Sequence, residues 1–488
     1  MRQLGIRKLG MKKLRNLGVP LTVSSLQQQY RAGELSPQTV VEALIAELKV
    51  RGDDGIWIYR LPEDDLRSRA RALEKAAEEK TTGQTHPLWG IPFSIKDCID
   101  VAGLPTSAGS PGFVYTATHT NPVVQNLLDA GAILIGKTNL DQFATGLVGI
   151  RTGYTVPHNA FSKSHIPGGS SSGSALSVAV GLVSFALGTD TGGSGRVPAG
   201  FNNIVGLKPT KGLLSTAHTV EACKTLDCIS IFALTAEDTQ TIFETAQSYD
   251  PTHPFSRPMS EPPPRLGTYQ PKQAFRFGVP QPAQREFFGN MDVEGLYERA
   301  IATLIEMSGI CQEIDYGPFL KANELLFNGP WVAERYASVG SFIEAAPESV
   351  FPTTYEILSK AGKITAVEAF EGLYAVEVLK RKSQPLWDEI DFLVVPTTGT
   401  IYRIDEVEAE PLRLNANLGY YTNFVNLLDL CAIALPNGFQ TNGLPSGITL
   451  IAPPHSESYL TKLGMAFRAN HRGSAEYRLG ATAFALTL

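Results

Sequence analysis

The chain has 488 residues, of which 43% are hydrophobic and 18% are charged, together with 45 glycines and 32 prolines. This composition favours a loop-rich α/β protein of one or two large domains over a helical bundle. A net charge of −6 gives no electrostatic reason to expect a nucleic-acid partner. The sequence contains no run of about 18 apolar residues, so we expect no membrane span.

The five cysteines, at positions 98, 223, 228, 311 and 431, are too scattered for a disulfide framework and form no CxxC pair. We therefore expect a reducing, cytoplasmic compartment. The sequence has no HExxH motif, paired-cysteine motif or aspartate-rich ligand loop, so we expect neither a metal site nor a cofactor.

Residues 1–20 are a basic N-terminal segment, because six lysines and arginines lie between Met1 and Leu17 and no acidic residue appears before Glu34. The pattern fits a transit-like segment or a helix on a membrane surface, but it lacks the apolar core of a secretory signal. A solvated, disordered terminus is the simpler interpretation.

Two helices are expected next. Ser36 as the N-cap and Pro37 in the first turn give a preferred start to a helix that ends before Gly52. A second helix, over 63–80, has an acidic start and alternating charges, which predict an exposed surface helix.

Two candidate bases follow at the ends of strands. An apolar strand over 88–95 leads into Lys96, and a helix over 121–130 precedes a strand over 132–136 that leads into Lys137. This β-α-β order favours a parallel or mixed sheet. A lysine partly buried at a strand end can lose its proton near neutral pH, because desolvation disfavours the ammonium form.

Two Gly/Ser clusters, 168–174 and 190–196, lie on either side of a predicted buried helix (175–180) and strand (183–187). Consecutive glycines let backbone N–H groups converge on an oxyanion while the Ser194 hydroxyl attacks a carbonyl. A serine needs a base, and the eight histidines are scattered, so a Ser-His-Asp triad would draw one from a distant loop. Lys96 acting through Ser170 is the alternative.

Such clusters, seen alone, are usually only tight turns. A phosphate-binding interpretation has less support, because no GK[ST] motif follows either cluster. The later chain alternates strands and helices around a proline-rich surface connection. We expect strands over 229–234, 275–279, 310–314 and 392–395, helices over 235–248 and 292–307, the connection over 249–274, and a hairpin ending at 452.

The stretches GIPFSIKD, GGSSSGSA and GTDTGGSGRVPAGFNNIVGLKPTKG resemble the amidase signature family of serine hydrolases, over essentially residues 21 to 463. The resemblance implies the amidase signature fold, a mixed, largely parallel twisted β-sheet covered by helices on both faces, in one catalytic domain over 21–488. It implies a Ser-Ser-Lys triad of Ser194, Ser170 and Lys96, with a cis peptide bond before Ser170 and no catalytic role for Lys137.

The same resemblance assigns the oxyanion hole and its support. The backbone of Thr191, Gly192, Gly193 and Ser194 matches the oxyanion hole of the family, and Ser171, Asp190 and Arg196 match the residues that brace the loop.

Stretches over 147–162, 325–337 and 421–430 resemble the allophanate hydrolase branch. That branch implies hydrolysis of a small carboxylate-bearing amide, allophanate, to ammonia and carbon dioxide in urea degradation, a functional link to urea carboxylase, and a homodimer. Arg335 would grip the carboxylate, since a planar guanidinium offers two parallel hydrogen bonds, and Phe327 and Gly169 would line the same pocket. From the residues alone, the simpler interpretation of Arg335 is an arginine paired with Glu334 or another surface acid.

This chain departs from that branch at two positions. Phe327 stands where the allophanate hydrolases have a tyrosine, and Gly192 stands where they usually have alanine. Losing a hydroxyl donor to a charged group costs about 1.5–3 kcal/mol, which weakens binding without forbidding the reaction. Tyr154, Tyr336 and Tyr421 are candidate replacements.

Three alternatives stay open. One is an amidase of broader small-amide specificity, and another is a glutaminase-like component of a tRNA amidotransferase. That second branch usually continues its nucleophile motif as GGSIR, whereas this chain has Gly195. The third is a non-catalytic binding protein on the same fold, against which the intact Lys96, Ser170 and Ser194 argue.

Overall fold

The computed structural model describes residues 17–78, 86–259, 266–270, 272–471 and 479–482. The expectation for the basic segment 1–20 therefore falls almost wholly outside the described residues. None of the helices within these ranges is long and apolar enough to cross a membrane.

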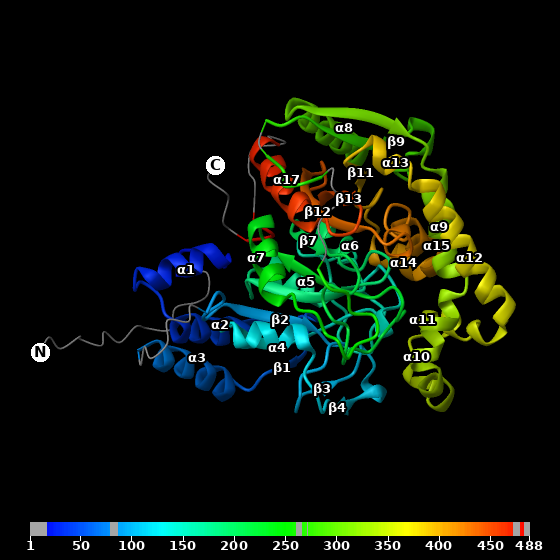
Figure 1. Cartoon of the computed structure of the whole chain (residues 1–488). Coiled ribbons are helices and arrows are strands. Elements are labelled where there is room, and N and C mark those ends of the chain that lie inside the picture. Colours follow the sequence, from blue (N-terminus) through cyan, green and yellow to red (C-terminus); the bar gives the residue numbers. More distant parts are fainter. Residues whose placement is uncertain (1–16, 79–85, 260–265, 271, 472–478, 483–488) are drawn as a thin grey trace, which may run out of the picture.

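An eleven-stranded mixed sheet runs through the molecule in the order β1-β5-β2-β6-β8-β7-β12-β13-β11-β9-β10 (Figure 1). Its strands are β1 (Trp57–Arg60), β2 (Pro92–Lys96), β5 (Ile133–Thr138), β6 (Phe185–Asp190), β7 (Val205–Lys208), β8 (Cys228–Ala233), β9 (Phe275–Pro280), β10 (Gly309–Ile314), β11 (Phe392–Pro396), β12 (Cys431–Phe439) and β13 (Pro445–Ala452). A second, two-stranded sheet pairs β3 (Pro105–Thr106) with β4 (Tyr115–Thr116).

Parallel pairing occupies two parts of the large sheet, β5-β2-β6 and β11-β9-β10. Between them, the strands from β6 to β11 pair antiparallel, including the predicted hairpin of β12 and β13. Every residue of β2, β5, β6 and β8 is buried. Such continuous apolar runs belong to strands that are covered on both faces.

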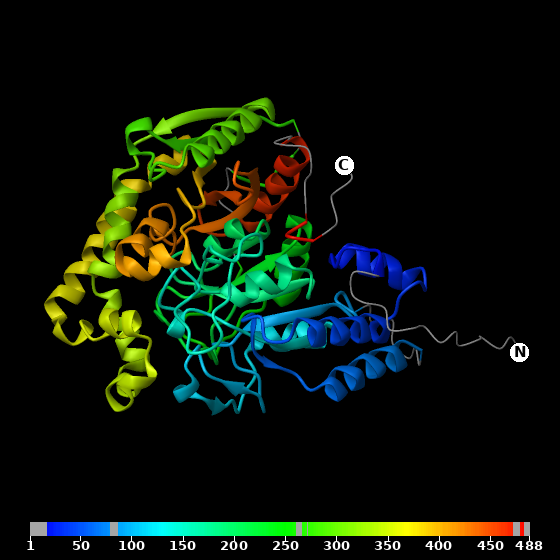
Figure 2. The same cartoon turned by 180° about the vertical axis from the view of Figure 1, so that it is seen from behind.

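Helices cover both faces, as expected, and further helices form a flank beside the sheet (Figures 1 and 2). They are α1 (Val23–Arg31), α2 (Pro37–Arg51), α3 (Glu63–Glu78), α4 (Pro122–Asp129), α5 (Ser172–Ala179), α6 (Val197–Phe201), α7 (Ala236–Ala246), α8 (Met291–Glu306), α9 (Gly317–Asn328), α10 (Trp331–Ala345), α11 (Pro352–Leu358), α12 (Ala366–Ser383), α13 (Leu386–Glu389), α14 (Ile404–Ala409), α15 (Pro411–Leu418), α16 (Phe424–Leu427) and α17 (Glu457–Asn470).

Local sequence signals place several of these helices correctly. The Ser36 side chain accepts a hydrogen bond from Thr39 N at the start of α2, and Thr235 caps α7 by accepting from Asp238 N. Gly52 ends α2 with a φ of 66°, a conformation that glycine adopts without strain.

Two expectations needed adjustment. The strand expected over 88–95 forms only from Pro92, because the residues before it make a turn. The strand expected over 183–187 is β6, which begins and ends later, at Phe185 and Asp190. The described residues of the proline-rich connection 249–274 carry no helix or strand.

Candidate active site

The site lies where two neighbouring parallel strands end. β2 ends at Lys96 and β6 ends at Asp190, and the two strands pair in register. Parallel strands bring their carboxyl ends to the same edge of a sheet, which is where α/β proteins build sites. Ser170 lies just before α5, and Ser194 lies in the turn between β6 and α6. The lysine and both Gly/Ser clusters therefore meet at one edge.

Lys96, Ser170 and Ser194 form a continuous hydrogen-bonded relay. Lys96 Nζ donates to Ser170 Oγ over 2.7 Å, and Ser170 Oγ donates to Ser194 Oγ over 2.9 Å. Lys96 Nζ also donates to Thr189 Oγ1 over 2.7 Å. All four side chains are buried, and desolvation lowers the pKa of Lys96. A lysine in this setting is prepared to act as a neutral base.

Lys137, the rival base, is engaged elsewhere. Its ammonium lies 3.2 Å from Asp97 Oδ1 and donates to the carbonyl oxygen of Pro105 over 2.7 Å. Both members of this ion pair are buried. Burial raises the pKa of Asp97 although Lys137 opposes the change. The contacts of Lys137 are therefore structural, and Lys96 is the lysine of the hydrogen-bonded relay.

The backbone before Ser170 is tightly enclosed. The Gly169–Ser170 peptide bond is cis. A side chain at Gly169 would collide with the Asp141 carboxylate and would reach the backbone nitrogen of Gly149 at 2.5 Å. Only glycine fits at this position, which sets the path of the chain into the first Gly/Ser cluster.

Asp190 holds the nucleophile loop in shape. Its carboxylate accepts hydrogen bonds from the N–H groups of Gly193 and Gly195, each over 2.9 Å, and two more from the Arg196 guanidinium, also over 2.9 Å. Burial alone would raise the pKa of Asp190, but Arg196, Lys208 and the hydrogen bond from Gly195 N together outweigh this effect and keep the pKa below its ordinary value. The carboxylate thus stays charged and fixes the loop around Ser194.

Further contacts join this loop to distant segments. Arg196 Nη1 donates to the carbonyl oxygen of Thr422 over 3.1 Å, and Asn426 Nδ2 donates to that of Asp190 over 2.7 Å. Ser171 Oγ donates to the carbonyl oxygen of Thr189 over 3.1 Å, beside the relay. The three residues expected to brace the loop, Ser171, Asp190 and Arg196, all lie against it.

The backbone N–H groups of the loop are not equivalent. The N–H of Gly193 is bonded to Asp190, whereas those of Thr191, Gly192 and Ser194 have no acceptor among the described residues. The Thr191 hydroxyl donates to the buried carboxyl of Asp227, whose pKa burial raises to about 6. Three N–H groups of the loop are therefore available to an oxyanion.

Arg335, on α10, is a buried guanidinium that forms no ion pair among the described residues, although its charge opposes the rise that burial causes in the pKa of Asp227. It is 3% exposed, its Nη1 donates to the carbonyl oxygen of Ala144 over 3.4 Å, and its Nε has no partner. Among the described residues, no carboxylate lies within 4.0 Å of it. Glu334 instead accepts from the backbone and hydroxyl of Thr225, each over 2.8 Å. The interpretation of Arg335 as the partner of Glu334 is therefore wrong.

The family model named Amidase matches residues 40–461. The chain belongs to the amidase family. It is 42% identical over 434 residues to the urea amidolyase of Saccharomyces cerevisiae, which covers 88% of this chain and 23% of that protein. It is also 32% identical to one of the glutamyl-tRNA(Gln) amidotransferase subunits of Chloroflexus aggregans, covering 92% of this chain and 96% of that protein.

Solved structures support the same family assignment. The Kluyveromyces lactis allophanate hydrolase superposes with a TM-score of 0.86 at 38% identity, covering 94% of this chain and 74% of that one. The K. lactis urea amidolyase gives a TM-score of 0.88 at 37% identity, over 96% of this chain and 28% of that one. The chain thus spans about a quarter of the urea amidolyases it matches. It is an amide-hydrolysing enzyme similar to allophanate hydrolase, and not a non-catalytic binding protein.

In this amidase, the hydroxyls of two of the three candidate tyrosines are already occupied by other groups of the chain. Tyr336 donates to Glu344, and Tyr421 exchanges hydrogen bonds with the backbone of Glu286. Tyr154 lines a separate pocket with Trp57 and Asp53. The hydroxyl that Phe327 lacks is therefore not supplied by Tyr336 or Tyr421.

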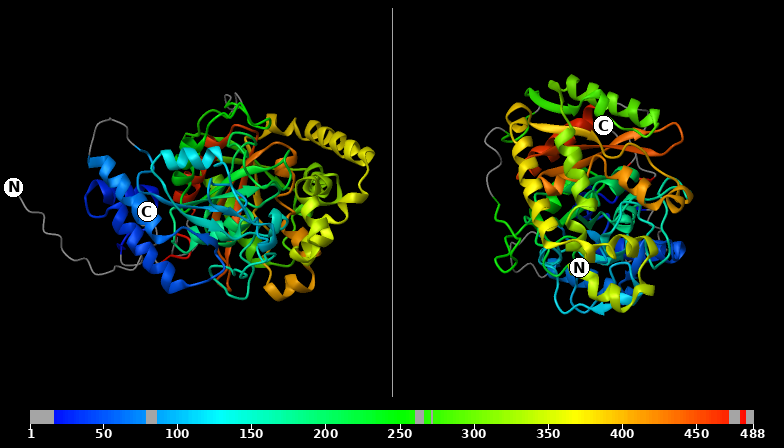
Figure 3. Two further views of the ribbon diagram at one scale, coloured as in Figure 1. Left: turned by 90° about the horizontal axis from the view of Figure 1, so that it is seen from below. Right: turned by 90° about the vertical axis from the view of Figure 1, so that its right-hand side faces the viewer.

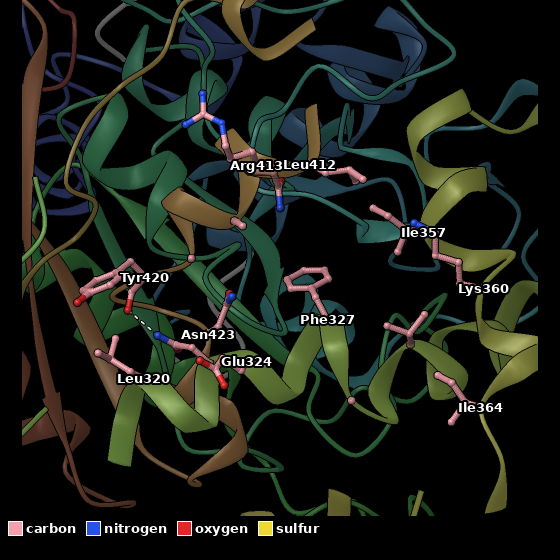
Figure 4. A pocket seen from close by; sticks show the side chains of 16 residues that line it. Leu320, Glu324, Phe327, Ile357, Lys360, Ile364, Leu412, Arg413, Tyr420 and Asn423 are labelled. Atoms are coloured by element: carbon pink, nitrogen blue, oxygen red, sulfur yellow. Dashed lines mark hydrogen bonds between the residues drawn. The ribbon is translucent and has the colours of Figure 1, made fainter. Parts of the chain in front are cut away.

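A pocket of about 730 Å³ is lined mainly by residues of α9 and α15 (Figure 4), and Lys96, Ser170 and Ser194 are not among its lining residues. Phe327 projects into it, and Asn423 also lines it. The Phe327 ring centroid lies 5.4 Å from the Arg335 guanidinium, and Asn423 Oδ1 lies 3.1 Å from where a Cβ at Gly192 would stand. The pocket wall is therefore in contact with both the guanidinium and the nucleophile loop.

Among the described residues, three polar atoms beside the loop are buried and unpartnered: Asn423 Oδ1, Thr422 Oγ1 and Ser230 Oγ, the last of which lies against Gly195. Thr422 packs on Gly193, and Asn423 packs on Gly192. The place of the alanine methyl group usual at position 192 is filled by the side chain of Leu326, from α9. The free acceptors and the free guanidinium give this part of the amidase a complementary set for a ligand with both N–H and carboxylate groups.

Sequence reasoning missed Thr189, Asp227 and Asn426 as parts of the site. Thr189 and Asn426 lie in stretches already noted for their resemblance, so motif membership was the available signal. Asp227 lies outside those motifs, and only the folded loop reveals its contact with Thr191. In the described ranges, no group of three His, Cys, Asp or Glu side chains is arranged to hold a metal ion.

Proposed function

We propose that this amidase hydrolyses a small carboxylate-bearing amide, specifically allophanate, to ammonia and carbon dioxide. The observation that carries the proposal is the buried Arg335, which has an unpartnered Nε and forms no ion pair among the described residues. A buried, unpaired charge is costly to the free protein, so a ligand carboxylate is its natural partner. α9 connects the two parts, because Leu326 packs on Gly192 and Phe327 lies against Arg335.

The reaction would proceed through an acyl-enzyme on Ser194. Neutral Lys96 accepts a proton from Ser170, which accepts one from Ser194 as its oxygen attacks the amide carbonyl, so both hydroxyl hydrogens turn toward the lysine. The free N–H groups of Thr191, Gly192 and Ser194 stabilise the oxyanion, at roughly 3–4 kcal/mol per donor.

Collapse of the tetrahedral intermediate breaks the C–N bond. The relay returns the proton to the departing nitrogen, which leaves as ammonia. Water then adds to the acyl-enzyme by the same relay and releases the acyl group as a carboxylate, freeing Ser194. From allophanate this product is an N-carboxylated carbamate, which breaks down to ammonia and carbon dioxide.

Substrate binding would use three side chains. The Arg335 guanidinium donates to the carboxylate, while Asn423 Oδ1 and Thr422 Oγ1 accept from the N–H groups of the substrate. We extend the proposal to one catalytic domain over 21–488, a cytoplasmic location in which the five cysteines stay as free thiols, and a supply of allophanate from urea carboxylase.

The test is ammonia release from freshly prepared allophanate, malonamate, glutamine and propionamide by the wild type. Ser194→Ala should abolish turnover, and the matched surface variant Ser359→Ala should not. Turnover of allophanate and malonamate alone supports the proposal. Turnover of propionamide with allophanate inert overturns the substrate and keeps an amidase of broader specificity. Turnover of glutamine alone favours the amidotransferase-like alternative, which the 32% identity to the C. aggregans amidotransferase protein makes the second candidate.

A further inference from the structure

Thr191 and Asp227 face each other just beyond the end of two paired strands. β6 and β8 pair antiparallel, and the last residue of β6, Asp190, lies opposite the first residue of β8, Cys228. The position after β6 and the position before β8 therefore continue the same register. There the Thr191 hydroxyl donates to Asp227 Oδ1, and both side chains are buried. A side-chain contact thus joins the start of the nucleophile loop to the neighbouring segment where the strand pairing ends.

Asp227 also closes a turn over residues 222–227, which we call the Asp227 turn. Its carboxylate accepts from Ala222 N over 2.7 Å and from Cys223 N over 3.1 Å. The N–H groups of Leu226 and Asp227 donate back to the carbonyl oxygen of Cys223 over 2.9 and 2.8 Å. The same carboxylate therefore accepts two hydrogen bonds from its own turn and one from the nucleophile loop. Hydrogen bonds to an ionised acceptor are stronger than those between neutral groups, so this carboxylate fixes all three donors.

Two distant segments hold the Asp227 turn in place. Glu334, on α10, accepts from the N–H and the hydroxyl of Thr225, each over 2.8 Å. Asn426 Nδ2 donates to the carbonyl oxygen of Leu226 over 3.0 Å. α10 is the helix that carries Arg335, and it lies on the flank of the molecule, yellow-green in Figure 3. The Asp227 turn is therefore anchored on both sides and is a fixed support for the nucleophile loop.

The Thr191 N–H needs such a support because it has to stay free. It is one of the three N–H groups of the nucleophile loop without an acceptor among the described residues. A donor that stabilises an oxyanion has to be aimed before the charge develops. The Gly193 N–H is fixed by a direct bond to Asp190, and it is then no longer available. At Thr191 the side chain is fixed instead, and the N–H remains available.

We propose that Asp227 is a positioning residue for amide hydrolysis, which aims the Thr191 N–H at the oxyanion without touching the substrate. Its carboxylate holds the Thr191 hydroxyl, and the fixed side chain restricts the backbone that carries the N–H. The inference rests on the oxyanion hole of the proposed function. It does not depend on allophanate as the substrate, because every amide that Ser194 attacks develops the same charge.

The first experiment compares Thr191→Val, which removes the hydroxyl and keeps the branched shape, with Thr191→Ser, which keeps the hydroxyl. One readout is steady-state hydrolysis of the amide that the wild type turns over fastest. The other is the rate at which a fluorophosphonate labels Ser194. In that reaction the serine oxygen bonds to phosphorus, fluoride leaves, and the proton passes to the relay, while the P=O oxygen occupies the oxyanion hole. The labelling rate needs no amide, so it tests Asp227 even where allophanate is inert.

We expect Thr191→Val to lower kcat and the labelling rate constant each by about 10- to 100-fold, because the donor is misaimed and not removed. KM should change by less than about threefold, and Thr191→Ser should recover most of both losses. Ser215→Ala is the matched control, since it breaks a hydroxyl–carboxylate contact of 2.9 Å to Asp250 that involves neither the relay nor the nucleophile loop. It should change neither readout by more than about twofold. Wild-type values in Thr191→Val, or equal losses in both Thr191 variants, overturn the proposal.

The second experiment tests whether Asp227 acts through Thr191. Asp227→Asn should lower the labelling rate constant by about 10- to 100-fold, and combining it with Thr191→Val should add less than about threefold, because both changes remove the same contact. Fully additive losses overturn this route. Where Asp227→Asn does not fold, as judged by thermal unfolding, the two Thr191 variants still decide the proposal. A wild type that is labelled but leaves allophanate intact overturns the substrate and not this inference, and a wild type that is not labelled overturns both.

Discussion

Replacing Arg335 by methionine separates recognition of a carboxylate from the chemistry at Ser194. The guanidinium is buried, and within the described part of the chain its Nε has no partner and its one hydrogen bond, to Ala144 O, is 3.4 Å long. Methionine has a similar length and no charge, so the free protein loses little. We therefore expect Arg335→Met to leave the melting temperature unchanged or raised, which a structural arginine would not do.

The expected kinetic loss follows from the contacts that the guanidinium can make. A bidentate contact with a carboxylate contains two hydrogen bonds to charged groups, about 1.5–3 kcal/mol each and about 3–6 kcal/mol together. At about 1.4 kcal/mol per tenfold, Arg335→Met should lower kcat/KM for malonamate by about 10²–10⁴. Turnover of propionamide, which has no carboxylate, should change by less than about threefold.

Steady-state ammonia release with both amides measures this difference. Thermal unfolding with and without malonate provides a second readout, because a ligand that binds the native state raises the melting temperature, and it should do so only for the wild type. Arg335→Lys keeps the charge without the planar fork and should fall between the two. An equal loss on both amides, or a lowered melting temperature with unchanged selectivity, would refute the reasoning.

Three other predictions follow from the site. Because burial lowers the pKa of Lys96, kcat/KM should fall as the pH drops below that pKa and the lysine becomes charged. Lys96→Met should lower kcat by about 10²–10⁴. A pH–rate profile in which kcat/KM does not fall at low pH contradicts the role of Lys96 as the base. Gly193→Ala should abolish activity because its φ is 143° and its Cβ would lie 2.5 Å from Thr422 Oγ1. Gly192→Ala meets the flexible end of Leu326 and, at 3.1 Å, Asn423 Oδ1, so it should cost less than about tenfold in kcat/KM; equal losses for the two variants argue against this packing. Asn423→Ala should raise KM for malonamate about five- to fiftyfold with an unchanged melting temperature, and an unchanged KM removes it from the binding site.

Local chemistry explains what the sequence predicted well. Capping by Ser36 and Thr235 depends on residues three positions apart, and fully apolar runs such as β6 have few alternatives to a buried strand. The meeting of Lys96 with Ser170 was predicted from motif resemblance, and the geometry has the hydrogen bonds that such a relay needs. Its catalytic use stays a prediction until the variants are assayed.

Other features depend on how distant segments pack. The edge strand β1 is short and only half-buried, so its sequence has no strong alternation of apolar and polar residues. Helices were expected between the strands at 310–314 and 392–395, but the bounds of α9 to α12 were not predicted, and α12 hides its helical period because two of its faces are apolar. The Gly193 N–H donates to Asp190 because the loop closes on itself, and no spacing in the sequence predicts this contact. The resemblance assigns the oxyanion hole to four residues, and we propose it with the three remaining N–H donors.

The contacts of the nucleophile loop with Thr422 and Asn426 bear on the synthesis of the protein. A growing chain completes the whole signature region, including Lys96 and Ser194, more than 200 residues before Asn426 is made. Until then, Arg196 and Asp190 lack the carbonyl and amide groups that position them. The reactive serine is therefore positioned only after the segment around Asn426 has been made, so a chain truncated before that segment has the motif residues without a fixed site.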